Sequence, residues 1–172
     1  RKTDISKGRE LLGEAKVNES ANVAVVHPGA GGIQKCWCVD NFVGLAGRLQ
    51  EKGFEPVFVL GPAEEQRFAR ESIEKLEDKS LCLRGLKLSE ILAVISAAEC
   101  YAGNDSGVTH LAGAMGVRTA VVFGPTDSEL YRPLGPYVAV FAGQQQGFCD
   151  AFDEPLQGQI ADYLAAGSDC QS

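Results

Sequence analysis

The 172-residue chain lacks any apolar run long enough to cross a bilayer, so no transmembrane helix is predicted. Positive charge is also scarce, with 16 lysines and arginines against 23 aspartates and glutamates and a formal net charge of −7. Because nucleic-acid binders and electrostatic membrane anchors need basic surfaces, this balance argues against both classes. An anionic ligand can still bind where local donors overcome the unfavourable global field.

Several familiar site patterns are also missing. Six cysteines are present, but Cys36 and Cys38 are separated by one residue where a zinc-binding CxxC pair has two. We therefore expect no metal site, and reduced thiols as in a cytoplasmic protein. The serine in "GNDSG" does not stand in the GxSxG pattern of a nucleophile elbow, so a serine hydrolase is disfavoured as well.

The N-terminal stretch "RKTDISKGRELLGEAK" shows neither a signal-peptide pattern nor an initiator methionine. We expect a cytoplasmic protein and, from the missing methionine, a segment of a longer chain. Residues 1–21 are predicted to form a short helix and linker. Residues 22–172 are predicted to form one domain, which is long enough to bury a sizeable core.

Short apolar runs rich in β-branched residues alternate with helical patterns along the chain. Continuous apolar strands are typical of a parallel sheet that is covered by helices on both faces. Right-handed crossovers then favour an α/β Rossmann-like domain, in which ligands bind beyond the carboxyl ends of the strands. The predicted strands cover residues 22–28, 55–61, 80–85, 99–103, 118–124 and 137–143.

Apolar residues at three- and four-residue spacing predict the helices between these strands. The second of them is preceded by the acidic pair Glu64 and Glu65, which suits a helix start. The helical patterns cover residues 42–49, 68–76, 89–95 and 108–115, with a final helix over 156–166.

The loop "HPGAGGIQKCWC" follows the first predicted strand. Its glycines allow close backbone approach, and exposed N–H groups suit a phosphate. The candidate phosphate-loop residues are Gly29, Gly31 and Gly32. The order of residues nearly matches the P-loop pattern GxxxxGK[ST], but Gln34 and Cys36 replace the second glycine and the magnesium-binding hydroxyl. A P-loop nucleotide hydrolase is therefore disfavoured.

The first loop and two further loops offer polar side chains after strands. Lys35, in the first loop, is a phosphate partner by charge, against the alternative of a surface lysine in a turn. In "GPAEEQ", Glu64 can accept hydrogen bonds from ribose hydroxyls. Taken alone, the alternative of an acidic helix start stabilised by the helix dipole is favoured for Glu64. Thr126 and Asp127 resemble a cap for a short helix, with a functional role equally open.

The stretch "GNDSGVTH" carries the densest group of polar residues. Asn104 or Asp105 is predicted to cap a helix that begins near Ser106. Gly107 leaves that helix end open, so its free N–H groups form an anion site. His110 lies one turn into the helix, and its side chain leans back toward the same opening. The pattern predicts a socket for a phosphate-bearing ligand, although capping alone is the alternative for Asp105 and Ser106.

Taken together, these loops resemble glycosyltransferase family 9, the ADP-heptose:lipopolysaccharide heptosyltransferases. The segments that carry the resemblance are "HPGAGGIQKCW", "LGPAEE", "GNDSGVTHLAGAMG" and "VVFGPTD", in the family's order over residues 22–135. The third is the specific signature, and the others are weaker alone. Cys36 and Cys38 depart from the family pattern, which has arginine and proline around the tryptophan.

The resemblance implies a GT-B fold, which has two Rossmann-like domains, and this chain resembles the C-terminal, donor-binding half. By the same resemblance, Lys35 and the backbone of Ser106 and Gly107 would contact the diphosphate of a nucleotide sugar. Glu64 would hold the ribose.

The resemblance also implies that Asp105 and His110 contact the sugar or phosphate. The domain would serve an inverting transfer of heptose or a related sugar, from ADP-heptose to a lipopolysaccharide core acceptor, without a metal or other cofactor. The acceptor site and catalytic base belong to the family's N-terminal half, so this chain alone is expected to bind donor without turnover. The expected location is the cytoplasm, including the inner face of the inner membrane.

Two alternatives remain open from the sequence. A UDP-N-acetylglucosamine 2-epimerase-like GT-B enzyme also places Asp-Ser-Gly at this helix, although His110 and the Lys35-x-Trp37 loop favour the heptosyltransferase family. A non-catalytic nucleotide-binding module is the other alternative.

Overall fold

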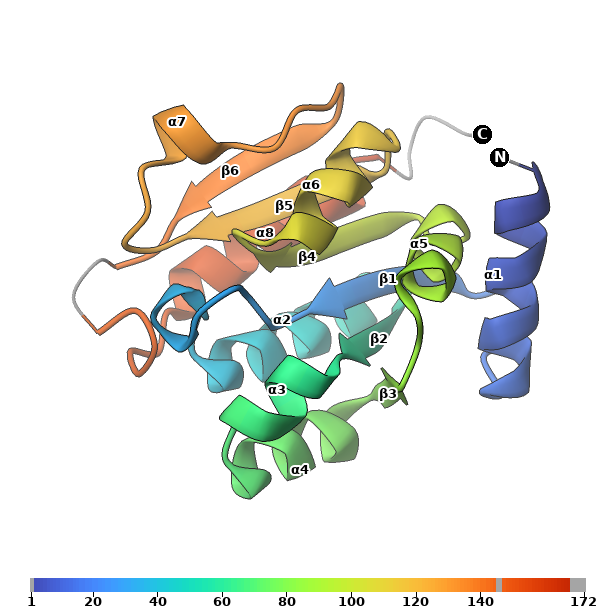
Figure 1. Cartoon of the computed structure of the whole chain (residues 1–172), viewed down its shortest axis with the longest axis horizontal. Coiled ribbons are helices and arrows are strands. Elements are labelled where there is room, and N and C mark those ends of the chain that lie inside the picture. Colours follow the sequence, from blue (N-terminus) through green and yellow to red (C-terminus); the bar gives the residue numbers. More distant parts are fainter. Residues whose placement is uncertain (1, 145–146, 168–172) are drawn as a thin grey trace.

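The computed structural model describes residues 2–144 and 147–167. Six parallel strands form one sheet in the order β3-β2-β1-β4-β5-β6 (Figure 1). This order and the strand positions confirm the predicted Rossmann-like sheet. The strands are β1 (Asn22–His27), β2 (Phe54–Leu60), β3 (Leu81–Arg84), β4 (Cys100–Asn104), β5 (Arg118–Phe123) and β6 (Val138–Ala142).

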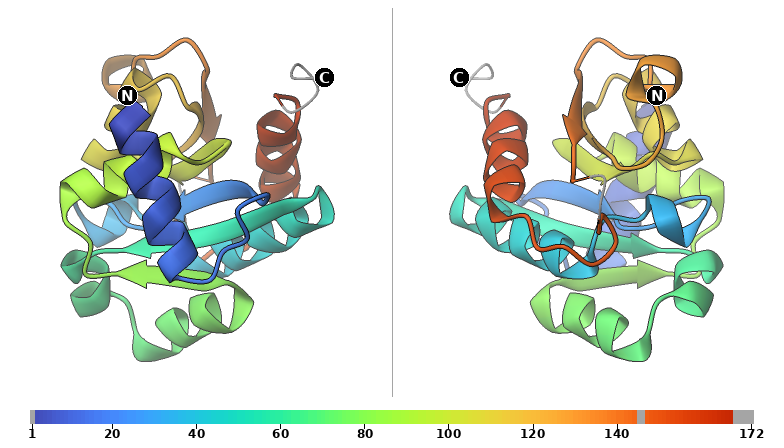
Figure 2. Two further views of the ribbon diagram at one scale, coloured as in Figure 1. Left: turned by 90° about the vertical axis from the view of Figure 1, so that its right-hand side faces the viewer. Right: turned by 90° about the vertical axis from the view of Figure 1, so that its left-hand side faces the viewer.

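Helices cover both faces of the sheet, as continuous apolar strands require. Alternate residues of β1 point to opposite faces, so Ala24 and Val26 lie in one core cluster while Val23 and Val25 lie in the other. Figure 2 shows the last helix on one side of the sheet and the first helix on the other. One layer contains α2 (Val39–Glu51), α4 (Arg70–Lys79) and α8 (Glu154–Ala165), and the other α1 (Lys2–Glu14), α5 (Leu88–Ser96) and α6 (Gly107–Ala114).

The helix after β2 differs from the prediction, because the single expected helix is two. α3 (Pro62–Arg67) ends before Phe68, whose backbone is extended, and α4 begins after Ala69. Phe68 is buried in a small cluster with Ala30 and Cys36 of the loop that follows β1. Phe68 thus packs against the glycine-rich loop from the break between the two helices.

The first helix shares the hydrophobic core of the sheet. Leu12 of α1, and Val17 in the segment after it, are buried in the same cluster as the strands of that face. A Cβ at Gly8 would overlap the carbonyl oxygen of Ala93, so the missing side chain lets α1 pack closely on α5. Figure 1 shows α1 beside α5, on the side opposite to that toward which the β1 and β6 arrows point.

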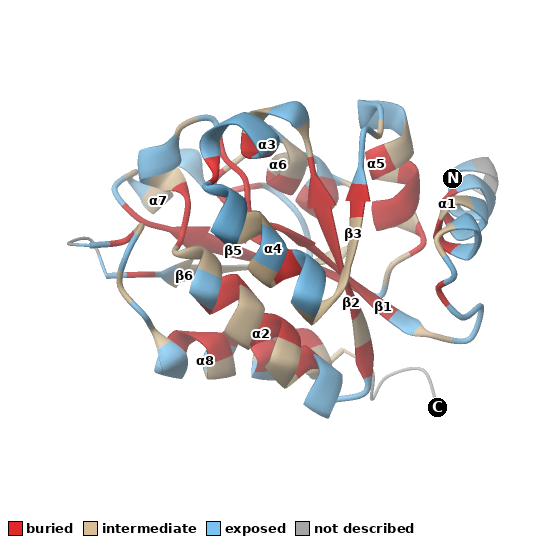
Figure 3. Ribbon diagram, turned by 90° about the horizontal axis from the view of Figure 1, so that it is seen from below, coloured by how far each residue is buried: buried red, intermediate tan, exposed pale blue. Residues whose placement is uncertain are grey.

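The fold provides a binding region at the carboxyl ends of the strands. Figure 3 shows buried residues along the strands and exposed ones on the outer sides of the helices. The chain leaves β1 toward β2 and leaves β4 toward β5, on opposite sides. Loops that diverge in this way create a crevice at the carboxyl ends of the two central strands. The segments after β1 and β4 therefore form the candidate site.

Candidate functional site

Asn104 ties the two central loops together. Its side-chain oxygen accepts a hydrogen bond from the Trp37 backbone N–H at 2.9 Å, and its side-chain nitrogen donates to the Pro28 carbonyl at 2.7 Å. Asn104 is fully buried, so both bonds are shielded from water. The predicted capping role of Asn104 is wrong, because its amide holds the glycine-rich loop against the end of β4.

Ser106 caps α6, which is the alternative left open for it, and neither Asn104 nor Asp105 is the cap. It has an extended backbone, and its hydroxyl oxygen accepts from the Thr109 N–H at 3.3 Å. The Thr109 hydroxyl donates to the Asn104 carbonyl at 2.6 Å and lies 3.0 Å from the Tyr101 hydroxyl. The start of the helix is therefore fixed by short hydroxyl side chains, which leaves the Asp105 carboxylate for other partners.

Asp105 is the centre of a polar cluster that also contains Lys35, Thr126 and His110. Its Oδ2 accepts from Lys35 Nζ at 2.8 Å and from Thr126 Oγ1 at 3.0 Å. His110 Nε2 lies 3.6 Å from Oδ1. The Asp105 side chain is 9% exposed, whereas those of Lys35 and His110 are 32% and 43% exposed. A buried carboxylate thus holds two nitrogen-bearing side chains at the surface.

The polar cluster confirms that three predicted site residues converge, although they lie up to 75 positions apart in the chain. Thr126 and Asp127, which follow β5, have different partners. Asp127 caps α7 (Ser128–Tyr131) by accepting from the Glu129 N–H at 2.9 Å, as predicted. Thr126 instead bonds Asp105.

The glycines of the site differ in what surrounds them. A Cβ added at Gly107 or at Gly31 would meet no atom of the protein within 4 Å, so both backbones are open. A Cβ at Gly32 would touch the side chain of Gln34 in the same loop, and one at Gly29 would overlap the Glu64 carboxylate. Gly107 and Gly31 are thus the positions where a ligand can approach the main chain.

Glu64 belongs to a second group, beside Gly29, Gly61 and His27. Its Oε2 accepts from the Gly61 N–H at 2.7 Å, which confirms the helix-start role, and Glu64 is 6% exposed. The ribose role remains a prediction.

His27 is the residue of this region to which the sequence assigns no role. It ends β1, is buried, and has its Nε2 at 4.0 Å from Glu64 Oε2. Its Nδ1 is buried without a hydrogen-bond partner in the described part of the chain. Burial lowers the pKa of His27, although the negative charge of Glu64 and the backbone of Gly29 oppose this. The sequence feature that could have identified His27 is its position, because it is a polar residue at the carboxyl end of a strand.

Acid should destabilise the folded protein through His27. The unfolded chain binds a proton on this side chain below about pH 6.5, where the folded protein with its lowered pKa does not, so stability is lost as the pH falls. One such group contributes at most about 1.4 kcal/mol per pH unit. We expect His27→Gln to flatten the slope of unfolding free energy between about pH 6.5 and about pH 5, measured by urea denaturation. An unchanged slope would contradict a neutral, buried imidazole.

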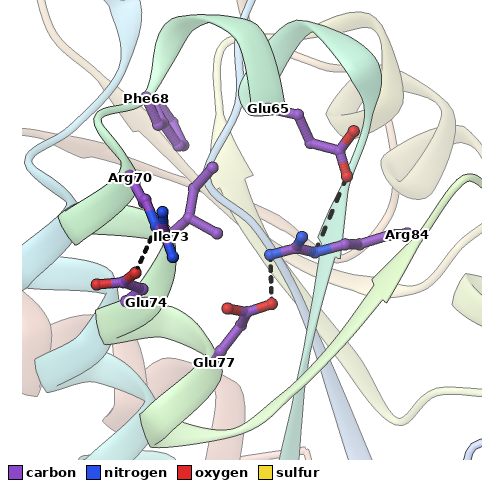
Figure 4. A pocket seen from close by; sticks show the side chains of 7 residues that line it. All are labelled: Glu65, Phe68, Arg70, Ile73, Glu74, Glu77 and Arg84. Carbon is purple, nitrogen blue, oxygen red and sulfur yellow. Dashed lines mark hydrogen bonds and ion pairs between the residues drawn. The ribbon is translucent and has the colours of Figure 1, made fainter.

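A hollow of about 520 Å³ lies over α3, α4 and β3 (Figure 4), and no residue of the polar cluster lines it. Its charged side chains are paired with one another. Arg84 forms ion pairs with Glu65 and Glu77, and Arg70 pairs with Glu74 at 2.8 Å. These contacts join the two helices to the edge strand, and we assign no ligand to the hollow.

The cysteines of the described residues are free thiols. Burial raises the pKa of Cys36 and Cys82 to about 11 and that of Cys100 to about 12. Cys38 and Cys149 are free as well, whereas Cys170 lies outside the described residues. Over the described ranges, no three His, Cys, Asp or Glu side chains are grouped for a metal ion. Within the same ranges, no helix has the length and apolarity to cross a bilayer.

A doubly wound sheet with polar side chains gathered at its central carboxyl edge defines a Rossmann-like binding domain. The model of glycosyltransferase family 9 (heptosyltransferase) matches residues 3–155, and the chain belongs to this family. Family membership decides in favour of the heptosyltransferases over the epimerase-like enzymes.

Curated relatives agree with the family assignment. Lipopolysaccharide heptosyltransferase 3 of Escherichia coli (strain K12) is 32% identical over 126 residues, which are 71% of this chain and 37% of that protein. Lipopolysaccharide heptosyltransferase 1 of Pseudomonas aeruginosa is 31% identical over 124 residues, covering 72% of this chain and 34% of the relative. The matched part of this chain therefore covers little more than a third of the length of these relatives.

Solved structures share the fold. ADP-heptose lipopolysaccharide heptosyltransferase II of E. coli superposes with a TM-score of 0.75 at 19% identity, covering 96% of this chain and 53% of that one. E. coli heptosyltransferase WaaC with ADP gives a TM-score of 0.69 at 21% identity, covering 86% and 45%. The predicted likeness to one domain of a GT-B glycosyltransferase is confirmed.

Proposed function

We propose that this chain is the donor-binding domain of an inverting glycosyltransferase that transfers heptose, or a related sugar, from ADP-heptose to a lipopolysaccharide core acceptor. Family membership supports the reaction class, and the names of two structural relatives include ADP-heptose or ADP. The observation that carries the proposal is the polar cluster, in which Lys35 and His110 meet at Asp105 beside the open backbone of Gly107.

The proposed task of the domain is to stabilise the departing nucleoside diphosphate. The acceptor hydroxyl attacks the anomeric carbon and gives its proton to the catalytic base, the bond from that carbon to the diphosphate oxygen breaks, and negative charge develops on the diphosphate. The free N–H groups and positive dipole end of α6 begin at Gly107, and Lys35 supplies a cation nearby. Groups fixed before the reaction stabilise such charge without reorganisation, and Asp105 fixes Lys35.

The proposal divides the enzyme between two parts. We place the acceptor site and the catalytic base in an N-terminal half outside this chain. The chain alone then binds donor without turnover, and the whole enzyme acts in the cytoplasm at the inner face of the inner membrane. A Rossmann-like half encoded upstream of Arg1 supports this division, whereas the absence of such a half favours a non-catalytic nucleotide-binding module.

Calorimetric titration with ADP, UDP, GDP and their sugar conjugates tests the donor assignment. We expect ADP and ADP-heptose to bind more tightly than the other nucleotides. A preference for UDP or GDP would overturn the choice of donor. A chain that binds none of these nucleotides would overturn donor binding altogether.

Donor binding should not require a divalent metal ion. The proposed diphosphate partners are Lys35, His110 and the first N–H groups of α6, and together the lysine charge and these hydrogen-bond donors can bind a diphosphate without a metal ion. We expect the same ADP affinity in EDTA and in excess Mg²⁺, measured by calorimetry. Loss of binding in EDTA with recovery on adding Mg²⁺ would show that a metal completes the site.

A further inference from the structure

The buried pair of His27 and Glu64 lies at the carboxyl ends of β1 and β2, next to the glycine-rich loop. Three neighbours fix the Glu64 carboxylate. The Gly61 N–H donates to Oε2, the bare Cα of Gly29 leaves the space that Oε1 fills, and the His27 ring stands on the third side with Nε2 at 4.0 Å from Oε2. The carboxylate therefore has a defined position before any ligand arrives.

The chemistry of His27 indicates more than packing. A lowered pKa keeps the imidazole neutral, with one ring nitrogen carrying a proton and the other acting as an acceptor. A carboxylate opposite Nε2 favours the tautomer with its proton on that nitrogen. The acceptor Nδ1 is then buried without a partner among the described residues, which lowers stability. An apolar side chain in this place would avoid that cost.

The Glu64 carboxylate keeps capacity to accept further hydrogen bonds. An ionised carboxylate offers about four acceptor positions, and the Gly61 N–H occupies one of them. A carboxylate in a fixed position can accept hydrogen bonds from two adjacent hydroxyl groups at once. A ribose carries such a pair of hydroxyl groups. Because a carboxylate that rotates freely loses this geometry, a residue that holds its orientation contributes to recognition without touching the ligand.

We propose that His27 is a positioning residue, which holds the Glu64 carboxylate through the Nε2–H side of its ring so that the carboxylate can accept hydrogen bonds from the ribose hydroxyls of a bound nucleotide. This inference rests on the proposed nucleotide-binding function, and it extends that function to a residue that does not touch the ligand. Gly29 takes part by leaving room for the carboxylate.

The test compares ADP with 2′,3′-dideoxy-ADP by calorimetry, using the ratio of their dissociation constants as the readout. We expect the wild-type protein to bind ADP about tenfold or more tightly than the dideoxy compound, because a hydrogen bond to a charged group is lost. Glu64→Gln and His27→Leu should both bring this ratio toward one. A His27→Leu protein that folds and keeps the wild-type ratio would overturn the inference.

Two amide variants separate positioning from simple loss of packing. Glutamine places an N–H group near the position of the histidine Nε2, whereas asparagine places one near Nδ1. We expect His27→Gln to keep most of the ratio and His27→Asn to lose it, and equal ratios in these two variants would count against the role. They also provide the measurement if His27→Leu fails to fold.

Val25→Ala is the matched control. Val25 is buried on the same strand and the same face of the sheet as His27, two residues earlier, so its truncation lowers stability without altering the neighbours of Glu64. We expect its ratio to equal that of the wild type. A wild-type protein that binds ADP without preferring the ribose overturns only the inference, whereas one that binds no nucleotide overturns the proposed function on which it rests.

Discussion

Replacing Lys35 with alanine should lower the affinity for ADP by about tenfold or more, because a charge-assisted hydrogen bond contributes about 1.5–3 kcal/mol. Adenosine, which has no diphosphate, should bind nearly as it does to the wild type. The structure gives a second reason for the lower affinity for ADP. Lys35 Nζ lies 2.8 Å from Asp105 Oδ2, so its removal exposes an incoming diphosphate to a carboxylate whose charge is no longer balanced. Calorimetry with the two ligands measures both effects.

Lys52→Ala is the control for the change in net charge. The Lys52 side chain is 34% exposed, against 32% for Lys35, and it pairs with Asp162 at 2.7 Å. It follows the C-terminus of α2, next to the start of β2, and so lies at the opposite edge of the sheet from the polar cluster. We expect this variant to bind ADP like the wild type. Equal losses of ADP and adenosine in Lys35→Ala would show that the lysine does not act on the diphosphate.

The sequence was sufficient to predict the sheet and the convergence of the site. Six apolar runs separated by helical patterns leave few arrangements that bury every strand, and the Rossmann-like order is the one observed. Residues that follow parallel strands must then meet at one edge. For this reason Lys35, Asp105 and His110 could be placed together from the sequence, whereas the ligand that they bind remains a prediction.

What the sequence could not predict depends on contacts between distant segments. Asn104 stands where local pattern favours a helix cap, but its amide bonds Trp37 and Pro28, which lie 67 and 76 positions away. Phe68 fits a helical pattern, yet it lies between two helices and packs against the first loop. His27 is the last residue of a mostly apolar strand, and periodicity alone does not show whether a residue at the end of a strand is buried. In each case a tertiary partner overrides the local preference.

Replacing Gly107 with alanine should weaken ADP binding while leaving the fold as stable as the wild type or more so. Gly107 is the first residue of α6, and a Cβ there would meet no protein atom within 4 Å. Alanine reduces the chain entropy lost on folding, so the free energy of unfolding should rise by up to about 1 kcal/mol. The same methyl group occupies the space in which the proposed diphosphate approaches the helix N–H groups, so we expect a loss of affinity of about tenfold or more.

Two other glycines make the comparison specific. Gly13→Ala also places a methyl group in open space on a helix, but on α1, away from the site, so it should raise stability without changing ADP binding. Gly103→Ala should destabilise the protein, because its Cβ would lie 2.7 Å from the Tyr101 hydroxyl and 3.0 Å from the His27 carbonyl oxygen. Thermal melts and calorimetry on the three variants measure stability and binding separately. A Gly107→Ala protein with wild-type ADP affinity would mean that the ligand does not approach the start of α6, and the diphosphate would then have to be placed elsewhere on this edge of the sheet.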